Sequence, residues 1–143
     1  MRGKLEYLSA TPDEAFSAGM MGDGVVIFPE EGIVHAPCDG EITFVFPTKH
    51  AIGMKDMFGY EILVHVGVSS VKLEGEGFQV LVKEGDKVKR GDILLEFNLE
   101  LLKEKADSPA TPVILTNLNN KMHVECKKPG IIEVGEEIFR INM

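Results

Sequence analysis

The side chains of this sequence best suited to nucleophilic chemistry near pH 7 are its four histidines. An unperturbed imidazole is largely neutral at this pH, and one of its ring nitrogens then carries a free electron pair. His35 follows two apolar residues and His123 lies beside charged residues, which favours a structural or solvent-facing role for both. His50 and His65 are therefore the candidates for chemistry.

His65 belongs to the run YEILVHV, residues 60–66, which predicts a β-strand. Alternation along a strand puts Glu61, Leu63 and His65 on one face, and the other face carries Tyr60, Ile62, Val64 and Val66. The second face is the predicted core. His65 is therefore expected to point outward, beside Leu63.

The run before it places His50 in a similar position. Phe46, Thr48 and His50 share one side of the chain if Pro47 leaves this stretch locally extended. The segment KDMFG, residues 55–59, predicts a hairpin connection, so the two runs are expected to pair antiparallel.

Two registers of this hairpin are open. A loop centred between residues 56 and 57 places His50 opposite Leu63 and Thr48 opposite His65, whereas a loop centred one residue later places His50 opposite His65. Opposed or diagonal residues lie about 5 to 8 Å apart, so both rings reach one small group such as a phosphoryl. The alternative is a chance pair of surface histidines.

The rest of the sequence predicts an all-β domain: an antiparallel sandwich or barrel-sandwich hybrid with one or two short helical turns. The helical turns are expected near Thr11-Pro12-Asp13-Glu14, where Thr11 is a capping residue before the proline, and after Asn98. No linker divides residues 1–143, which we interpret as one domain, either free-standing or cut from a longer polypeptide. The predicted strands are Lys4–Leu8, Val25–Phe28, Gly32–Ala36, Glu41–Phe46, Tyr60–Val66, Phe78–Val82, Ile93–Phe97, Val113–Thr116, Ile131–Val134 and Glu137–Ile141.

Composition excludes several classes of function. A net charge of −8 with no cluster of basic residues argues against nucleic-acid binding. No stretch resembles a signal peptide or the roughly 20 apolar residues of a membrane span, so a cytoplasmic protein is expected. Cys38 and Cys126 lack metal-binding or redox spacing and are interpreted as free thiols.

The sequence resembles the glucose-family enzyme IIA domain of the bacterial phosphoenolpyruvate-dependent sugar phosphotransferase system. The resemblance rests on PTKHAIGM, GYEILVHVGVSSVKLEGEGF, EGDKVKRGDILLEFNLELLKEKA and SPATPVILTN, in this order. It implies a sandwich of the duplicated hybrid motif type. It also implies a carrier that takes phosphate from the phosphocarrier HPr and passes it to a cysteine of a sugar-specific IIB domain, with no cofactor required.

The resemblance also assigns roles to residues. His65 would be phosphorylated, His50 would support it, and Thr48 would orient His50. The apolar ring covered by partners would contain Ala15, Phe16, Met20, Met21, Phe46, Ile52, Leu63 and Val71. Asp13 keeps an acidic position of the family, whereas Ser69 stands where the family commonly has an acid, which puts the strength of partner binding in doubt.

Other functions remain as alternatives. His50 and His65 supply two ligands of a zinc site, but no third ligand at obvious spacing supports a zinc peptidase; zinc shared with a partner's carboxylate stays open. The glycine turns of EGDKVKRGDILLEF resemble biotinyl or lipoyl carriers, although Lys87 and Lys89 lack the setting of an acceptor lysine. A non-catalytic regulatory domain, with regulated enzymes or transporters as partners, would keep the same histidines.

Overall fold

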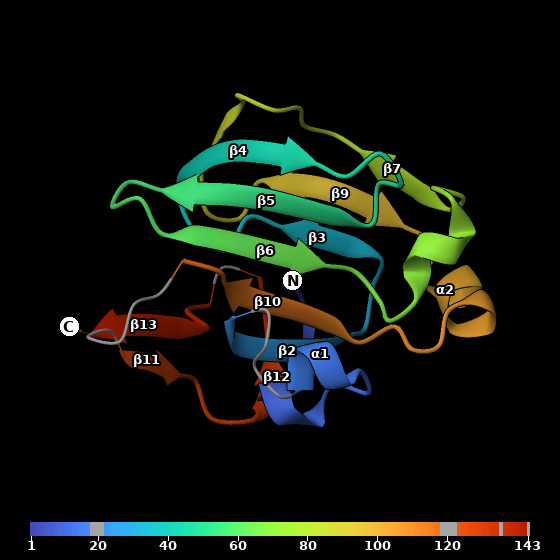
Figure 1. Cartoon of the computed structure of the whole chain (residues 1–143), viewed down its shortest axis with the longest axis horizontal. Coiled ribbons are helices and arrows are strands. Elements are labelled where there is room, and N and C mark those ends of the chain that lie inside the picture. The colour runs from blue at the N-terminus through green and yellow to red at the C-terminus, as the bar shows by residue number, and fades with distance from the viewer. Residues whose placement is uncertain (18–21, 118–122, 135, 143) are drawn as a thin grey trace.

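The computed structural model describes residues 1–17, 22–117, 123–134 and 136–142, and it is built almost entirely of antiparallel strands (Figure 1). The largest sheet has eight strands in the order β12-β1-β2-β10-β6-β5-β4-β8, and a second has the order β3-β9-β7. β11 and β13 form a separate pair. The all-β prediction is therefore confirmed. The strands are β1 Gly3–Tyr7, β2 Asp23–Pro29, β3 Ile33–His35, β4 Gly40–Val45, β5 Ala51–Asp56, β6 Glu61–His65, β7 Phe78–Val80, β8 Lys87–Val88, β9 Ile93–Phe97, β10 Thr111–Leu115, β11 His123–Cys126, β12 Gly130–Ile132 and β13 Phe139–Asn142.

Four short helical elements join these strands: η1 Leu8–Ala10, α1 Glu14–Ser17, η2 Ser70–Leu73 and α2 Leu99–Lys105. Asn98 caps α2 as predicted, because its side chain accepts a hydrogen bond from the Leu101 amide at 3.0 Å. The capping residue predicted for the first helix was wrong. Thr11 does not cap α1; its hydroxyl donates to the Leu8 carbonyl at 2.7 Å and closes η1 instead.

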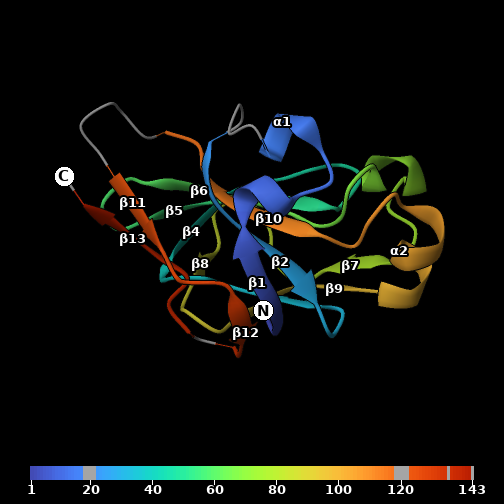
Figure 2. The ribbon, with the colours of Figure 1, turned by 90° about the horizontal axis from the view of Figure 1, so that it is seen from below.

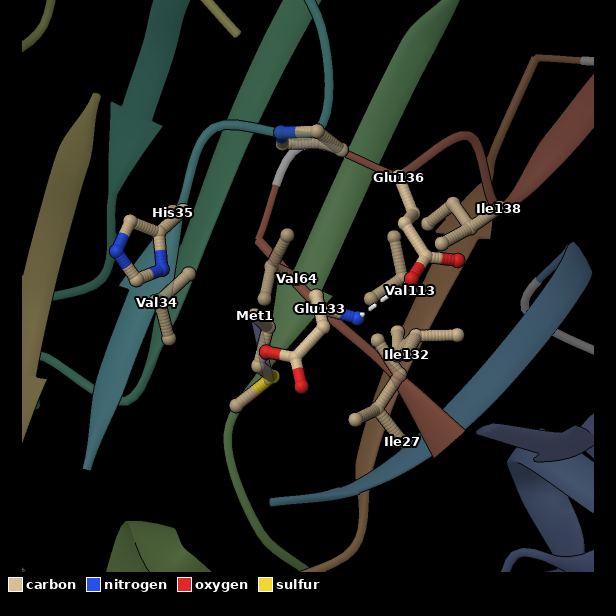
Figure 3. A pocket seen from close by; sticks show the side chains of 11 residues that line it. Met1, Ile27, Val34, His35, Val64, Val113, Ile132, Glu133, Glu136 and Ile138 are labelled. Atoms are coloured by element: carbon tan, nitrogen blue, oxygen red, sulfur yellow. Dashed lines mark hydrogen bonds between the residues drawn. The ribbon is translucent and has the colours of Figure 1, made fainter. Parts of the chain in front are cut away.

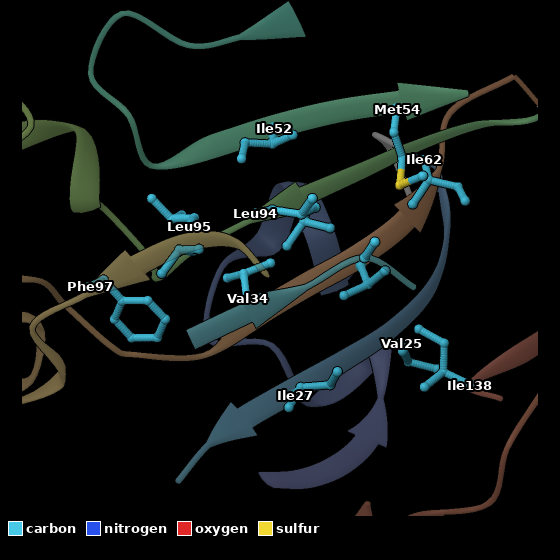
Figure 4. Packing of buried hydrophobic residues seen from close by; sticks show 14 of the residues in the cluster. Val25, Ile27, Val34, Ile52, Met54, Ile62, Leu94, Leu95, Phe97 and Ile138 are labelled. Atoms are coloured by element: carbon cyan, nitrogen blue, oxygen red, sulfur yellow. The ribbon is translucent and has the colours of Figure 1, made fainter. Parts of the chain in front are cut away.

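The main core lies between the large sheet and the three-stranded sheet. Ile52 of β5 and Ile62 of β6 are buried in one cluster with Leu94 and Leu95 of β9 (Figure 4). Burying one such side chain stabilises the fold by about 1.5 to 3 kcal/mol. This packing fixes the positions of β5 and β6, the two strands that lead to the candidate histidines.

The opposite face of β6 and β10 carries a second, smaller cluster. Leu63 and Ile114 pack there against Ala51, Leu8 and Phe16. α1 and η1 cover this side of the large sheet (Figure 2). The alternation predicted for residues 60–66 is therefore confirmed, but the face of His65 is covered at Leu63, which is only 6% exposed.

The predicted strand list omitted β5, β8 and β11. β8 is only two residues long, which is too short for periodicity to show. Within the part of the chain that the structure describes, no helix has the length and apolar character needed to cross a bilayer.

Candidate functional site

His65 is the last residue of β6, and its ring orientation is fixed by the backbone just beyond the strand. The Nδ1–H group of His65 donates to the carbonyl oxygen of Gly67 at 2.9 Å, because a carbonyl can only accept. In the neutral ring the other nitrogen, Nε2, then carries the free electron pair. Nε2 of His65 is therefore the nucleophilic atom of the site.

Gly67 holds that carbonyl through a conformation that favours glycine. Its φ is +80°, and a Cβ there would lie 3.1 Å from the Ser108 carbonyl oxygen and 3.3 Å from Leu102 Cδ1. The next residue is tied down as well, because the Val68 amide donates to the Ser108 carbonyl at 2.8 Å. The turn after His65 is thus a rigid support for its ring.

His50 lies in the turn between β4 and β5 and not in a strand. The Lys49 amide donates to the Phe46 carbonyl at 2.8 Å, and Lys49 has a left-handed φ of +64°. The His50 carbonyl then accepts a hydrogen bond from the Val66 amide at 2.7 Å. Pro47 begins a tight turn here, so the extended stretch predicted around it is wrong.

The hairpin register also differs from both predicted registers. Ala51 lies opposite His65, and Ile52 lies opposite Val64, which shifts the pairing by one residue from the nearer prediction. The pairing stays continuous as far as Lys55 opposite Glu61. The loop is therefore centred on Phe58, and neither His50 nor Thr48 faces a residue of β6 in the ladder.

The turn nevertheless brings the two imidazoles together. Their ring centroids are 4.8 Å apart and the rings are nearly perpendicular, at 77°. Thr48 Oγ1 and His50 Nδ1 share a hydrogen bond of 2.7 Å. The histidine pair and Thr48 thus form one cluster, as predicted, although the hairpin register does not produce it.

Burial lowers the pKa of both histidines. The pKa of His50 falls to about 4, first because the ring is desolvated and also because His65 lies beside it; an interaction with the Thr48 backbone opposes this. Desolvation likewise lowers the pKa of His65, against the opposing effects of the Gly67 carbonyl and the Asp13 carboxylate. Both rings are therefore neutral at pH 7.

Aromatic rings flank the histidine pair. The Phe16 ring centroid is 5.1 Å from that of His65, and the Phe46 centroid is 5.4 Å from that of His50 in an edge-on arrangement. Phe44 stacks on Phe46 in turn, with centroids 5.2 Å apart. These rings provide the apolar surroundings that desolvate the imidazoles.

The predicted partner surface is only partly at the surface. Val71 is 53% exposed, and Phe46 and Asp13 are half-buried. Ile52 was a wrong prediction, because it is 1% exposed and points into the main core. The remaining members are Phe16 and Leu63, which are buried in the second cluster; Ala15, whose backbone belongs to α1; and Met20 and Met21, which lie outside the described residues.

Sequence reasoning missed two polar residues beside the site. Ser70 is fully buried, and its hydroxyl donates to the Val66 carbonyl at 2.5 Å. Asp107 accepts a hydrogen bond of 2.6 Å from the hydroxyl of Ser69. The Ser69–Asp107 contact joins segments 38 residues apart, so no local pattern could have shown it.

The donor set of the described residues provides no complete metal site. No group of three or more histidine, cysteine or acidic side chains converges anywhere in the parts that the structure covers. His50 and His65 offer two imidazole nitrogens, so a zinc ion there would need ligands from another molecule. Zinc shared with a partner's carboxylate stays a prediction.

A small cavity lies elsewhere in the molecule (Figure 3). It has a volume of about 20 Å³, room for about one water molecule, and His35 is among its lining residues. Val64 and Val113 also line it, and both side chains belong to the main core. The cavity is therefore on the other side of the large sheet from Leu63 and Ile114, and it takes no part in the histidine cluster.

Comparison with known proteins decides the family. The sequence model described as phosphoenolpyruvate-dependent sugar phosphotransferase system, EIIA 1, matches residues 1–121. The chain belongs to this family. A glucose-specific EIIA component of Bacillus cereus is 53% identical over 117 residues, covering 82% of this chain and 71% of that protein. One from Halalkalibacterium halodurans is 52% identical over 136 residues, covering 95% and 79%.

Longer relatives and a solved structure agree with this EIIA assignment. A glucoside-specific EIICBA component of Staphylococcus carnosus is 46% identical over 140 residues, 98% of this chain. The chain spans only 20% of that relative's length. The structure of glucose permease IIA from Mycoplasma capricolum superposes with a TM-score of 0.90 at 36% identity, covering 96% of this chain and 89% of that one.

Proposed function

We propose that this EIIA domain, residues 1–143, carries a phosphoryl group on His65 Nε2 between two proteins. HPr is the donor, and a cysteine of a sugar-specific IIB domain is the acceptor. The observation that carries the proposal is the His65 Nδ1–H bond to the Gly67 carbonyl, which fixes the tautomer and directs the Nε2 electron pair away from the backbone. The family membership of the chain supports it.

The transfer steps follow from this geometry. The Nε2 electron pair of His65 forms an N–P bond while the N–P bond of the donor's phosphohistidine breaks, and the donor ring recovers its electron pair. His65 keeps its proton on Nδ1 throughout. In the second step the thiolate of the IIB cysteine attacks phosphorus, the N–P bond on His65 breaks, and the electron pair returns to Nε2.

His50 stabilises the phosphoryl group in this proposal. If the Thr48 hydroxyl donates to His50 Nδ1, the proton of the neutral ring sits on Nε2, beside His65. That N–H group donates to a phosphoryl oxygen as charge develops on it. Two imidazoles and one hydroxyl then suffice for transfer, and no cofactor takes part.

The wider setting of the chain follows from its relatives. The EIICBA relatives contain much more than the EIIA-like part, and the EIIA components match most of their own length. We infer that the domain works at the cytoplasmic side of a membrane permease, either fused to it or as a separate chain. The choice of sugar belongs to the permease.

Incubation with phosphoenolpyruvate, enzyme I and HPr, followed by intact mass measurement, tests the proposal. We expect one acid-labile phosphoryl adduct that His65→Ala abolishes and His35→Ala retains. His50→Ala is expected to keep acceptance from HPr better than onward transfer to IIB. An adduct that persists in His65→Ala would overturn the assignment, and an unphosphorylated wild type would favour the regulatory alternative.

A further inference from the structure

The segment after His65 carries an exposed carboxylate that the proposed chemistry does not use. Ser69 has a left-handed φ of +59°, and its hydroxyl donates to Asp107 Oδ2 at 2.6 Å. Lys72 Nζ donates to Asp107 Oδ1 at 2.9 Å. Both oxygens of the Asp107 carboxylate are therefore held by the turn that follows His65.

The backbone reinforces this arrangement. The Asp107 amide donates to the Val68 carbonyl at 3.0 Å, and the Val68 amide donates to the Ser108 carbonyl at 2.8 Å. Gly67, whose carbonyl orients His65, lies directly before this bridge. The carboxylate of Asp107 is thus positioned by the same short strip of backbone as the nucleophile.

Asp107 is charged and accessible. Its side chain is 59% exposed, and the hydrogen bonds from Ser69 and Lys72 lower the pKa of its carboxyl group. Val71 precedes Lys72 in η2, and this residue is 53% exposed. An ionised carboxylate next to an exposed apolar side chain is the composition expected at the rim of a protein interface.

We propose that Asp107 is a docking residue for a basic protein surface, and that it supplies from a distant segment the negative charge that Ser69 does not. This inference rests on the proposed function, because the basic partner is taken to be the phosphoryl donor. Lysine or arginine side chains of the donor replace Lys72 on Asp107 as the donor's phosphohistidine approaches His65. The net charge of −8 favours a cationic partner generally, and Asp107 fixes where it binds.

The test compares three folded variants in phosphoryl transfer from phospho-HPr, measured as the second-order rate constant at low ionic strength. Asp107→Asn is expected to lower this constant about two- to fivefold, the usual range for one exposed ion pair. The loss should vanish near 1 M salt, where the Debye length is about 3 Å. Glu84→Gln is the matched control: it removes the same charge from the turn before β8, the edge strand three places from β6.

Ser69→Asp combined with Asp107→Asn moves the charge and keeps a hydrogen bond, because the new amide can donate to the new carboxylate. Aspartate also tolerates the left-handed conformation of position 69. This pair should recover the wild-type rate constant. The inference is overturned if Asp107→Asn and Glu84→Gln have the same rate constant. It is also overturned if the double variant has a melting temperature that shows it to be folded and yet stays as slow as Asp107→Asn. Failure of the wild type itself to accept phosphate would instead refute the proposed function.

Discussion

Buried His50 is expected to make this fold sensitive to acid. Its pKa in the folded protein is about 4, against the ordinary histidine value of 6.5 in the unfolded chain. Between these values the unfolded chain binds a proton that the folded protein does not. The contribution to stability is therefore fully present above about pH 6.5 and is lost as the pH falls toward 4.

The size of the effect follows from the difference in pKa. One pKa unit corresponds to about 1.4 kcal/mol, so a shift of about 2.5 units is worth about 3.4 kcal/mol when complete. Roughly 2.5 kcal/mol of this should already be lost between pH 7 and pH 4.5. His50 is only 2% exposed, so water screens this effect little.

Urea unfolding of the wild type and His50→Gln, at several pH values from 7 to 4.5, measures this contribution. Glutamine does not titrate and can still bond to the Thr48 hydroxyl. The free energy of unfolding should therefore fall about 2.5 kcal/mol further in the wild type than in the variant. The contribution from His35, whose pKa burial also lowers, is common to both proteins and cancels. Parallel pH dependences, or a His50 ring signal in NMR that titrates near 6.5, would refute the reasoning.

Three further substitutions separate stability from chemistry. Thr48→Val removes the hydroxyl that shares a hydrogen bond with His50 Nδ1. We therefore expect urea melts to show a loss of about 1 to 3 kcal/mol and onward transfer to IIB to slow; unchanged melts would contradict this. Gly67→Ala forces a side chain into φ +80° beside the Ser108 carbonyl, which should cost about 1 to 3 kcal/mol in thermal melts and slow acceptance from HPr. A Gly67→Ala variant that melts at the same temperature as the wild type would contradict this expectation. Asn98→Ala removes the cap of α2 and should cost about 1 kcal/mol with an unchanged rate of phosphoryl acceptance, and a rate reduced more than twofold would contradict the separation.

The parts of the structure that could be predicted are those with a local cause. The alternation in residues 60–66 correctly put Leu63 and His65 on one face, because the core face of a strand repeats every two residues. The Asn98 cap was also readable, because a capping side chain acts within its own turn. In both cases the residues that decide the structure lie next to each other in the sequence.

The errors have tertiary causes. The position of His50 depends on whether Pro47 continues a strand or begins a turn, and both are compatible with the fixed φ of proline. The burial of Ile52 depends on β9, which packs across the core from β5. Asp107 reaches Ser69 only because β10 returns the chain to the end of β6, where Val113 pairs with Val64.

At the end of β6 two requirements of a phosphoryl carrier are met together: the nucleophilic nitrogen is held in place, and it can serve a donor and an acceptor in turn. Up to Val64 the strand is held on both faces, by the main core and by the cluster under α1, so its backbone cannot shift. At His65 the ladder to Ala51 still fixes the backbone, while the Gly67 carbonyl fixes the ring. The nucleophilic nitrogen is thus positioned before any partner binds, which lowers the entropic cost of reaching the transition state. The same nitrogen must serve a donor and an acceptor in turn. A rigid, neutral imidazole at a strand end can do this without rearranging its own chain, and the direction of transfer is then set by the partner that docks beside it.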